Sequence, residues 1–184
     1  MQDLHLPASD YRRMPWKNGT GATDEVWLWP PDADRHDFQI RVSRAPILAD
    51  GAFSGFAGAD RIITLIEGRA LALDFNHDSH LLAPLQPFRF DSGLAPLGRP
   101  LGGPVRVFNV MATRRDWTLS ASVLHQPATL EPGRAVILAL QPQCIATRGR
   151  QYSLAAQDTL ILGTGADAST GGPALVVRLN PACD

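Results

Sequence analysis

Cysteines, aromatic side chains, charges and long hydrophobic runs are all scarce in this sequence. Two of the 184 residues are cysteines, and aromatic and charged residues contribute 7% and 19%. The two cysteines, Cys144 and Cys183, have no CxxC spacing, so we expect both thiols to be free in a reducing compartment. No window approaches the roughly 18 apolar residues that a membrane-spanning helix requires.

The charge balance argues against two classes of partner. The formal net charge is -1, which gives no basis for binding nucleic acid or an anionic membrane surface. Residues 1–10 contain Asp3 and His5 but neither the basic nor the apolar segment of a secretory leader. We therefore expect a cytoplasmic protein without nucleic-acid or membrane partners.

The composition favours many short strands. Hydrophobic residues make up 45% of the chain, which is enough for a core, and the length fits one ordinary domain or two small ones. The 16 glycines and 15 prolines are spread along the chain instead of clustering. This distribution indicates many turns between strands.

Alternation of apolar and polar residues predicts the strands. In the clearest case Phe38, Ile40 and Val42 share one face, while Arg41 and Ser43 share the other. No amphipathic helix is evident, so we expect an all-β sandwich or barrel with very little helix. The run 95–104 resembles a folded linker, and 167–173 resembles an exposed loop. The strands are expected at residues 25–29, 38–45, 61–66, 70–75, 87–90, 105–112, 118–124, 135–140, 144–147, 151–154, 159–162 and 174–179.

A weak internal repeat suggests a tandem arrangement. Residues 62–73 form an apolar strand, a tight turn and a second strand, and residues 135–146 repeat this plan. Both segments continue with a short strand, an acidic turn and a further strand, which is the rhythm of half a jelly-roll barrel. The repeat therefore predicts tandem barrels, although any antiparallel meander shows some self-similarity.

The histidines do not form a metal-binding pattern. Small barrels often place two histidine ligands two residues apart on one strand. Here the closest pair, His77 and His80, is spaced i, i+3 in a run typical of a turn. We expect no bound metal and no other cofactor, and we find no nucleophile motif.

Polar side chains that could bind an anion gather in the first third of the chain. Thr23 and Glu25 share one strand face, Arg41 and Ser43 share another, and Arg61 begins a third strand. If these arginines converge with Lys17 of the opening loop, they would bind an anionic ligand, because the guanidinium group of arginine can donate two hydrogen bonds to one carboxylate. The alternative is that Arg41 faces solvent, and the alternation alone favours this alternative.

The sequence blocks resemble the HutD/Ves family. Three blocks carry the resemblance, and they follow the family's order over about residues 10–116. They are Pro15-Trp16-Lys17-Asn18-Gly19 with Gly21, Thr23 and Glu25; Ile40-Arg41-Val42-Ser43-Arg44-Ala45 with the Phe53-Ser54-Gly55-Phe56 block and Arg61; and Gly103-Pro104-Val105-Arg106-Val107-Phe108-Asn109.

The resemblance implies a bicupin, with two RmlC-like double-stranded β-helix barrels in one chain and without the usual cupin metal ligands. It implies an N-terminal barrel over residues 1–116 and a C-terminal barrel over 117–184, with strands that can be exchanged between them. It also reverses the interpretation of Arg41, whose face should now point inward. The implied ligand-binding residues are Lys17, Asn18, Thr23, Glu25, Arg41, Ser43, Ser54 and Arg61.

HutD proteins are associated with bacterial histidine utilisation. The resemblance therefore implies a binding protein for a small acidic metabolite, such as a formylated or formiminated glutamate or urocanate, in a supporting or regulatory role. The alternatives are a metal-free isomerase or hydrolase that uses Glu25 as its base, and a scaffold that binds through apolar loops around its tryptophans. The oligomeric state is left open, and a homodimer is one of the alternatives.

Three positions depart from the family pattern. Thr20 stands where a third glycine is common, and Asp24 stands where a basic residue is frequent. Val107 replaces the usual aspartate before Phe108-Asn109, so a buried salt bridge or the ligand preference is expected to change.

Overall fold

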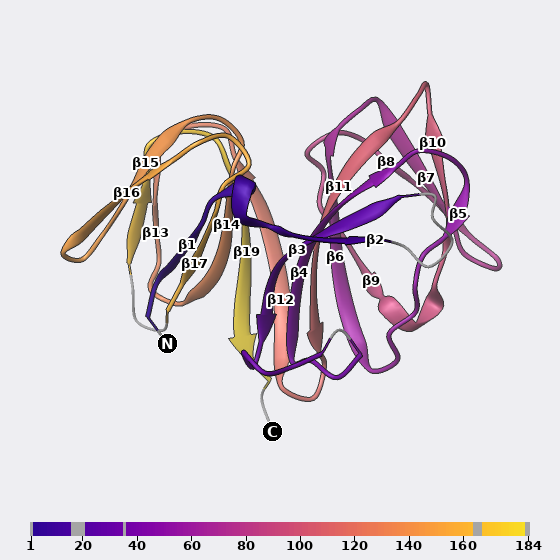
Figure 1. Cartoon of the computed structure of the whole chain (residues 1–184), viewed down its shortest axis with the longest axis horizontal. Coiled ribbons are helices and arrows are strands. Elements are labelled where there is room, and N and C mark those ends of the chain that lie inside the picture. The colour runs from indigo at the N-terminus through magenta and orange to yellow at the C-terminus, as the bar shows by residue number, and fades with distance from the viewer. Residues whose placement is uncertain (1, 16–20, 35, 164–166, 183–184) are drawn as a thin grey trace. The chain divides into compact units, whose positions relative to one another are not determined.

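The computed structural model describes residues 2–15, 21–34, 36–163 and 167–182. Within them the helical segments are two 3-10 helices of three residues, η1 (Ala8–Asp10) and η2 (Ser92–Leu94). Nearly everything else is strand or turn (Figure 1). The prediction of an all-β chain with very little helix is confirmed. No helix in the described part of the chain is long and apolar enough to cross a membrane.

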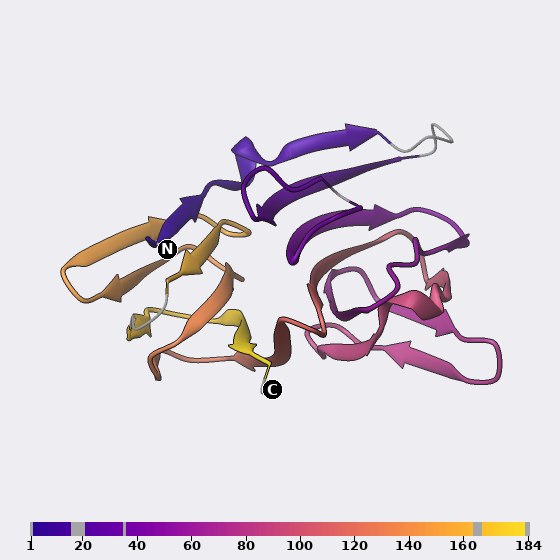
Figure 2. The same ribbon diagram turned by 90° about the horizontal axis from the view of Figure 1, so that it is seen from below.

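The chain divides into two compact units. The N-terminal unit comprises residues 12–118 and 182–184, and the C-terminal unit comprises residues 1–11 and 119–181. The first strand thus belongs with the end of the chain, because β1 (Leu4–Leu6) pairs antiparallel with β17 (Thr159–Leu162). Both views show this N-terminal strand beside the C-terminal segment (Figures 1 and 2).

The N-terminal unit contains two sheets. Six strands form the order β2-β3-β4-β11-β6-β9, and four form the order β5-β10-β7-β8. Their bounds are β2 (Arg12–Pro15), β3 (Ala22–Trp29), β4 (Ile40–Ile47), β5 (Gly51–Ala52), β6 (Ala59–Glu67), β7 (Ala70–Asp74), β8 (Ser79–Leu82), β9 (Phe88–Asp91), β10 (Leu97–Leu101) and β11 (Val105–Thr113).

The C-terminal unit is built in the same way. Five strands form the order β1-β17-β14-β19-β12, and four form the order β13-β18-β15-β16. Their further bounds are β12 (Trp117–Leu124), β13 (Ala128–Leu130), β14 (Arg134–Ala139), β15 (Gln143–Thr147), β16 (Arg150–Leu154), β18 (Ala168–Thr170) and β19 (Ala174–Pro181).

One strand order occurs twice in the chain. In the larger sheets β6 lies between β9 and β11, and β14 lies likewise between β17 and β19. In the smaller sheets β7 lies between β8 and β10, and β15 lies between β16 and β18. The remaining strands correspond as well: β4 lies beside β11 as β12 lies beside β19, and β5 lies beside β10 as β13 lies beside β18. The eight strands β4–β11 therefore have the same arrangement as the eight strands β12–β19.

Each unit has its own apolar core between its two sheets. In the N-terminal unit Ala45, Leu65 and Val107 of the larger sheet pack with Leu71 and Leu73 of the smaller one. Val107 is fully buried there and lies opposite Ala45 in the strand register. An apolar side chain therefore fills the position where the resemblance led us to expect an aspartate.

Two segments differ from the expectations. The run 95–104 was expected to be a linker, but it contains strand β10, which pairs with β5 and β7. The stretch 167–173 was expected to be a loop, but it contains β18, which pairs with β13 and β15. Their glycine, proline and small polar residues have low strand propensity, so pairing with neighbouring strands decides their conformation.

Candidate functional site

The inner face of β4 changes from polar to apolar along the chain. Arg41, Ser43 and Ala45 alternate onto the face that contributes to the core, and Arg41 and Ser43 are 8% and 3% exposed. Ile40 and Val42 on the opposite face are also buried, each 0% exposed. Both faces of this strand are therefore removed from water, and burying charge on one of them requires specific partners.

Glu25 of β3 is the partner of Arg41. The Nε of Arg41 donates to Oε2 of Glu25 across 2.8 Å, and Glu25 is 9% exposed. The register between β3 and β4 shifts between Glu25 and Trp27, so that Glu25 lies opposite Ser43 while Leu28 lies opposite Arg41. Such an irregularity re-aims side chains, and it brings this carboxylate within reach of Arg41.

Arg61 lies on the inner face two strands away from Arg41. Met111 of β11 lies opposite both arginines in the register. Arg61 is 4% exposed, and its guanidinium is held by neutral acceptors: Nε and Nη2 donate to Oγ of Ser92 at 3.2 and 3.0 Å. Nη2 also donates to the carbonyl oxygen of Ser54 at 2.8 Å. Among the described residues no carboxylate forms an ion pair with Arg61.

Aromatic rings surround the two guanidinium groups. The centroids of Phe53, Phe56 and Phe90 lie 5.3, 5.9 and 5.6 Å from Cζ of Arg61. The ring of Phe56 also lies 5.5 Å from Cζ of Arg41. These distances are typical of cation–π contacts, which partly compensate an arginine that has left water.

Burial and like charge lower the pKa of Arg61. Burial has the larger effect and the charge of Arg41 adds to it, so that the pKa falls to about 10. The group remains charged at neutral pH because this value is still well above 7. The folded protein therefore holds a cation in surroundings that disfavour its charge, and an anion bound beside it would relieve that cost.

Asn109 of β11 adds a polar atom to the same face. It lies opposite Ser43 in the register, and its Oδ1 is buried without a hydrogen-bond partner in the described part of the chain. A buried acceptor without a donor is costly. The inner face thus offers a free acceptor beside the two cations.

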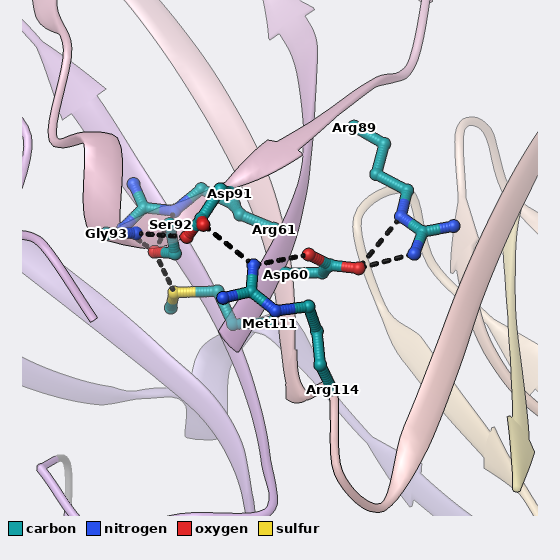
Figure 3. Close-up of polar contacts among 8 residues, drawn as sticks. All are labelled: Asp60, Arg61, Arg89, Asp91, Ser92, Gly93, Met111 and Arg114. Atoms are coloured by element: carbon teal, nitrogen blue, oxygen red, sulfur yellow. Dashed lines mark hydrogen bonds and ion pairs between the residues drawn. The ribbon is translucent and has the colours of Figure 1, made fainter. Parts of the chain in front are cut away.

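An ion-pair network lies on the other side of the same strands. Asp60 accepts from Arg89, whose Nε lies 3.0 Å from Oδ2, and Oδ1 of Asp60 lies 3.1 Å from Nη1 of Arg114. Nη1 of Arg114 also lies 2.9 Å from Oδ2 of Asp91. Figure 3 shows Asp91 turned toward Arg114, while the next residue, Ser92, reaches Arg61.

The predicted site residues are distributed as follows. Glu25, Arg41, Ser43 and Arg61 are buried on one sheet, and Arg41 pairs with Glu25. The remaining four predicted residues are Thr23, Ser54, Lys17 and Asn18. Thr23 is half-buried, and Ser54 is exposed and contributes its carbonyl oxygen to Arg61. Lys17 and Asn18 lie outside the described residues. Ligand binding by this set stays a prediction.

Sequence reasoning did not assign a role to Ser92, Asn109, Phe53 or Phe56. Three of these residues lie in blocks that resemble the family, so they could have been considered. Ser92 carried no such signal, because Asp91-Ser92-Gly93 is typical of an ordinary turn.

The chain also has an open cavity that is separate from this cluster. It has a volume of about 480 Å³ and lies in the C-terminal unit, where Gln2, Arg148, Arg150 and Tyr152 contribute to its lining. The described residues contain no group of three or more metal-ligating side chains. The buried arginines of the N-terminal unit are thus a candidate site, which is defined by charge and hydrogen bonding.

The fold and the paired sheets are those of a cupin-like protein. A barrel-domain protein of the cupin 2 class from Leptotrichia buccalis matches over 86% of this chain and 88% of its own, with a TM-score of 0.58 and 7% identity. At this identity the likeness concerns the fold alone.

The family model for HutD matches residues 8–175, and the chain belongs to the HutD family. HutD of Pseudomonas fluorescens SBW25, solved in a formate condition, is 28% identical and has a TM-score of 0.83, with 97% of this chain and 98% of that chain covered. A conserved protein of unknown function from Pseudomonas aeruginosa PAO1 is 31% identical, also with a TM-score of 0.83, over 98% of this chain and 100% of that chain.

Proposed function

We propose that this HutD protein binds a small carboxylate-bearing metabolite beside Arg41 and Arg61, and that it supports or regulates histidine utilisation without being a catalyst. The observation that carries the proposal is the Arg61 guanidinium, 4% exposed and held by neutral oxygens. With Arg41 and Glu25 it leaves one positive charge in excess on the inner face. A carboxylate would neutralise this excess and receive charge-assisted hydrogen bonds.

Unused donors support a carboxylate as the ligand. A guanidinium has five N–H donors. Within the described residues, Arg41 uses only Nε, and Nη1 of Arg61 has no acceptor. These groups are the donors that a carboxylate can engage. The free Oδ1 of Asn109 would in turn accept from a ligand N–H or O–H.

We infer that the two units are tandem double-stranded β-helix barrels, which is the bicupin arrangement. The eight-strand order that occurs in both halves of the chain supports this inference. In such barrels a polar patch on an inward-facing sheet is placed to line a ligand site. A buried polar patch on a surface of this kind supports the proposal that a small molecule binds there.

Calorimetry on the full chain tests the proposal. N-formylglutamate, N-formiminoglutamate, urocanate and formate are the probes, with succinate as an unrelated dicarboxylate. We expect at least one of the first four to bind, and Arg41→Ala to weaken that binding by about tenfold or more, because a charge-assisted pair is lost. The control is Arg106→Ala, which removes a half-buried arginine of β11 that pairs with Glu67. No heat with any probe would overturn the proposal.

The same samples test the enzymatic alternative. Consumption of one of these acids by the wild-type chain, lost in Glu25→Gln while binding survives, would identify a metal-free enzyme with Glu25 as its base. We expect binding without consumption. Mass spectrometry of the incubated acids makes the distinction.

A further inference from the structure

Arg61 differs from its neighbours in the kind of group that holds it. Each of the other arginines on β4, β9 and β11 pairs with a carboxylate: Arg41 with Glu25, Arg44 with Asp24, Arg89 with Asp60 and Arg106 with Glu67. Arg61, which is 4% exposed, is the most deeply buried of the five, yet its side-chain partner is the hydroxyl of Ser92. The least solvated cation has a neutral partner.

The hydroxyl group of Ser92 uses both its acceptor and its donor capacity in the contact with Arg61 and Met111. Ser92 is 0% exposed, and its Oγ accepts from both Nε and Nη2 of Arg61. Its own proton points to Sδ of Met111, 3.8 Å away, which is a weak acceptor. Ser92 thus aligns the guanidinium and leaves its positive charge uncompensated.

The outer ion pairs hold Ser92 in place. Asp91 caps the short helix η2, because its Oδ1 accepts from the backbone N–H of Gly93 at 2.8 Å. Its Oδ2 lies 2.9 Å from Nη1 of Arg114. Figure 3 shows Asp91 directed toward Arg114 and Gly93, while Ser92 is directed toward Arg61. The two carboxylates near the turn, Asp60 and Asp91, are both engaged by Arg114 and do not pair with Arg61.

We propose that Ser92 is a positioning residue that reserves the charge of Arg61 for an external anion. A carboxylate at this position would pair with Arg61 permanently and compete with any ligand. A neutral hydroxyl supplies the alignment without the competition. This inference rests on the proposed anion-binding function and names the residue that keeps the site available.

Substitutions at Ser92 in the full chain test the inference, with sodium formate as the probe. Ser92→Asp supplies an internal partner, so we expect formate affinity to fall by about tenfold or more without loss of folding. Ser92→Ala keeps the charge but loses the alignment, so we expect a smaller fall, of about threefold. The control for added charge is Leu94→Asp, at an exposed position of the same turn, and we expect formate affinity to stay within about twofold there.

The Nε–H signal of Arg61 in heteronuclear NMR gives a second readout that needs no ligand. We expect this signal to be sharp in the wild type, broadened in Ser92→Ala and shifted toward lower field in Ser92→Asp, because the hydrogen bond becomes charge-assisted. If the wild type bound no anion while these signals changed as expected, the proposed function would fail and the contact to Ser92 would stand.

Two results would overturn the inference. One is formate affinity in Ser92→Asp equal to that of the wild type or of Leu94→Asp. The other is an Arg61 Nε–H signal that Ser92→Ala leaves unchanged. If Ser92→Asp fails to fold, Ser92→Ala alone decides between these outcomes, because it adds no charge and removes a single buried oxygen.

Discussion

Arg41 donates its Nε–H to Oε2 of Glu25 across 2.8 Å, and both side chains are buried. The contact is diagonal, since Glu25 lies opposite Ser43 in the strand register. Glu25 is thus the carboxylate that pairs with the inner arginine Arg41, whereas Arg61 has no carboxylate partner among the described residues. Glu25 therefore affects two properties in opposite directions: it stabilises the fold by pairing with Arg41, and it reduces the attraction of the site for an anion.

Glu25→Gln should separate these two effects. Breaking a buried ion pair leaves an uncompensated charge, so we expect the free energy of unfolding to fall by about 3 kcal/mol. We also expect formate affinity to rise by several-fold, because a negative charge beside the ligand is removed. Urea denaturation and calorimetry measure the two quantities.

Glu67→Gln is the matched control for this prediction. It breaks the exposed pair between Arg106 and Glu67, whose Nε and Oε2 atoms lie 3.0 Å apart on the same sheet. An exposed pair is worth about 0.5 kcal/mol. Equal losses of stability in the two variants would show that the Glu25 pair is not a buried one in solution.

Arg61→Met should stabilise the protein when no ligand is bound. Because burial and the charge of Arg41 lower the pKa of Arg61 to about 10, the charged form costs free energy in the folded state at neutral pH. This cost is present in full below about pH 10 and is relieved only as the pH rises above that value. A methionine of similar length removes it, so we expect the free energy of unfolding to rise by about 1–2 kcal/mol at pH 7, together with loss of anion binding.

Arg44→Met supplies the contrast for the Arg61 prediction. Arg44 also lies on the six-stranded sheet, but its Nη2 lies 2.9 Å from Oδ2 of Asp24. Its removal deprives a carboxylate of its partner, so we expect destabilisation instead. Thermal unfolding without added anions distinguishes the two signs. A loss of stability in both variants would contradict the prediction for Arg61.

Strands with regular alternation were predictable from the sequence, and strands defined by pairing were not. The run containing Ile40 and Val42 shows alternation that any sheet would produce. Leu97-Gly98-Arg99-Pro100-Leu101 contains a glycine and a proline, and its strand β10 depends on β7 and β5 on either side. Propensity cannot reveal a strand that its neighbours stabilise.

The site was predictable only in part, because alternation identifies two faces but does not say which one is buried. Both Val42 and Arg41 are buried, so the pattern could not assign Arg41 to the inner face. The family resemblance supplied that assignment. The role of Ser92 depends on the turn after β9 and on its distance to Arg61, which is 31 residues away in sequence. No local pattern carries that information.

Gly98→Ala should disturb the aromatic side of the site. A Cβ at Gly98 would lie 2.5 Å from Cε2 of Phe53, whose ring lies 5.3 Å from Cζ of Arg61. Phe53 must therefore move, and we expect a loss of about 1–3 kcal/mol in the free energy of unfolding, together with weaker formate binding. The control is Gly51→Ala on the facing strand, because Gly51 pairs with Gly98 and a Cβ there meets no atom within 4 Å. A similar loss in both variants would exclude the contact with Phe53 as the cause.

Asp158 should make the attachment of the N-terminal strand depend on acid pH. Its carboxylate accepts from the backbone N–H groups of Ala8 and Ala155 at 2.8 and 2.9 Å, and Oδ2 lies 3.1 Å from Nε2 of His5. Burial alone would raise the pKa of Asp158, but these hydrogen bonds and the contact with His5 outweigh it and lower the pKa. The carboxylate therefore ties residues 5–8 to the turn before β17.

The Asp158→Asn variant should lose stability at neutral pH and approach the wild type in acid. A lowered carboxyl pKa contributes stability that is fully present above the ordinary aspartate value of about 4 and is lost as the pH falls through the folded-state value. We expect the variant to be less stable by about 2 kcal/mol at pH 7, because hydrogen bonds to a charged group are lost, with the difference shrinking steadily below about pH 4. Urea denaturation across this range measures it, with Asp50→Asn, at an exposed position, as the control. A difference that stays constant down to about pH 2 would show that the pKa of Asp158 is not what links this strand to pH.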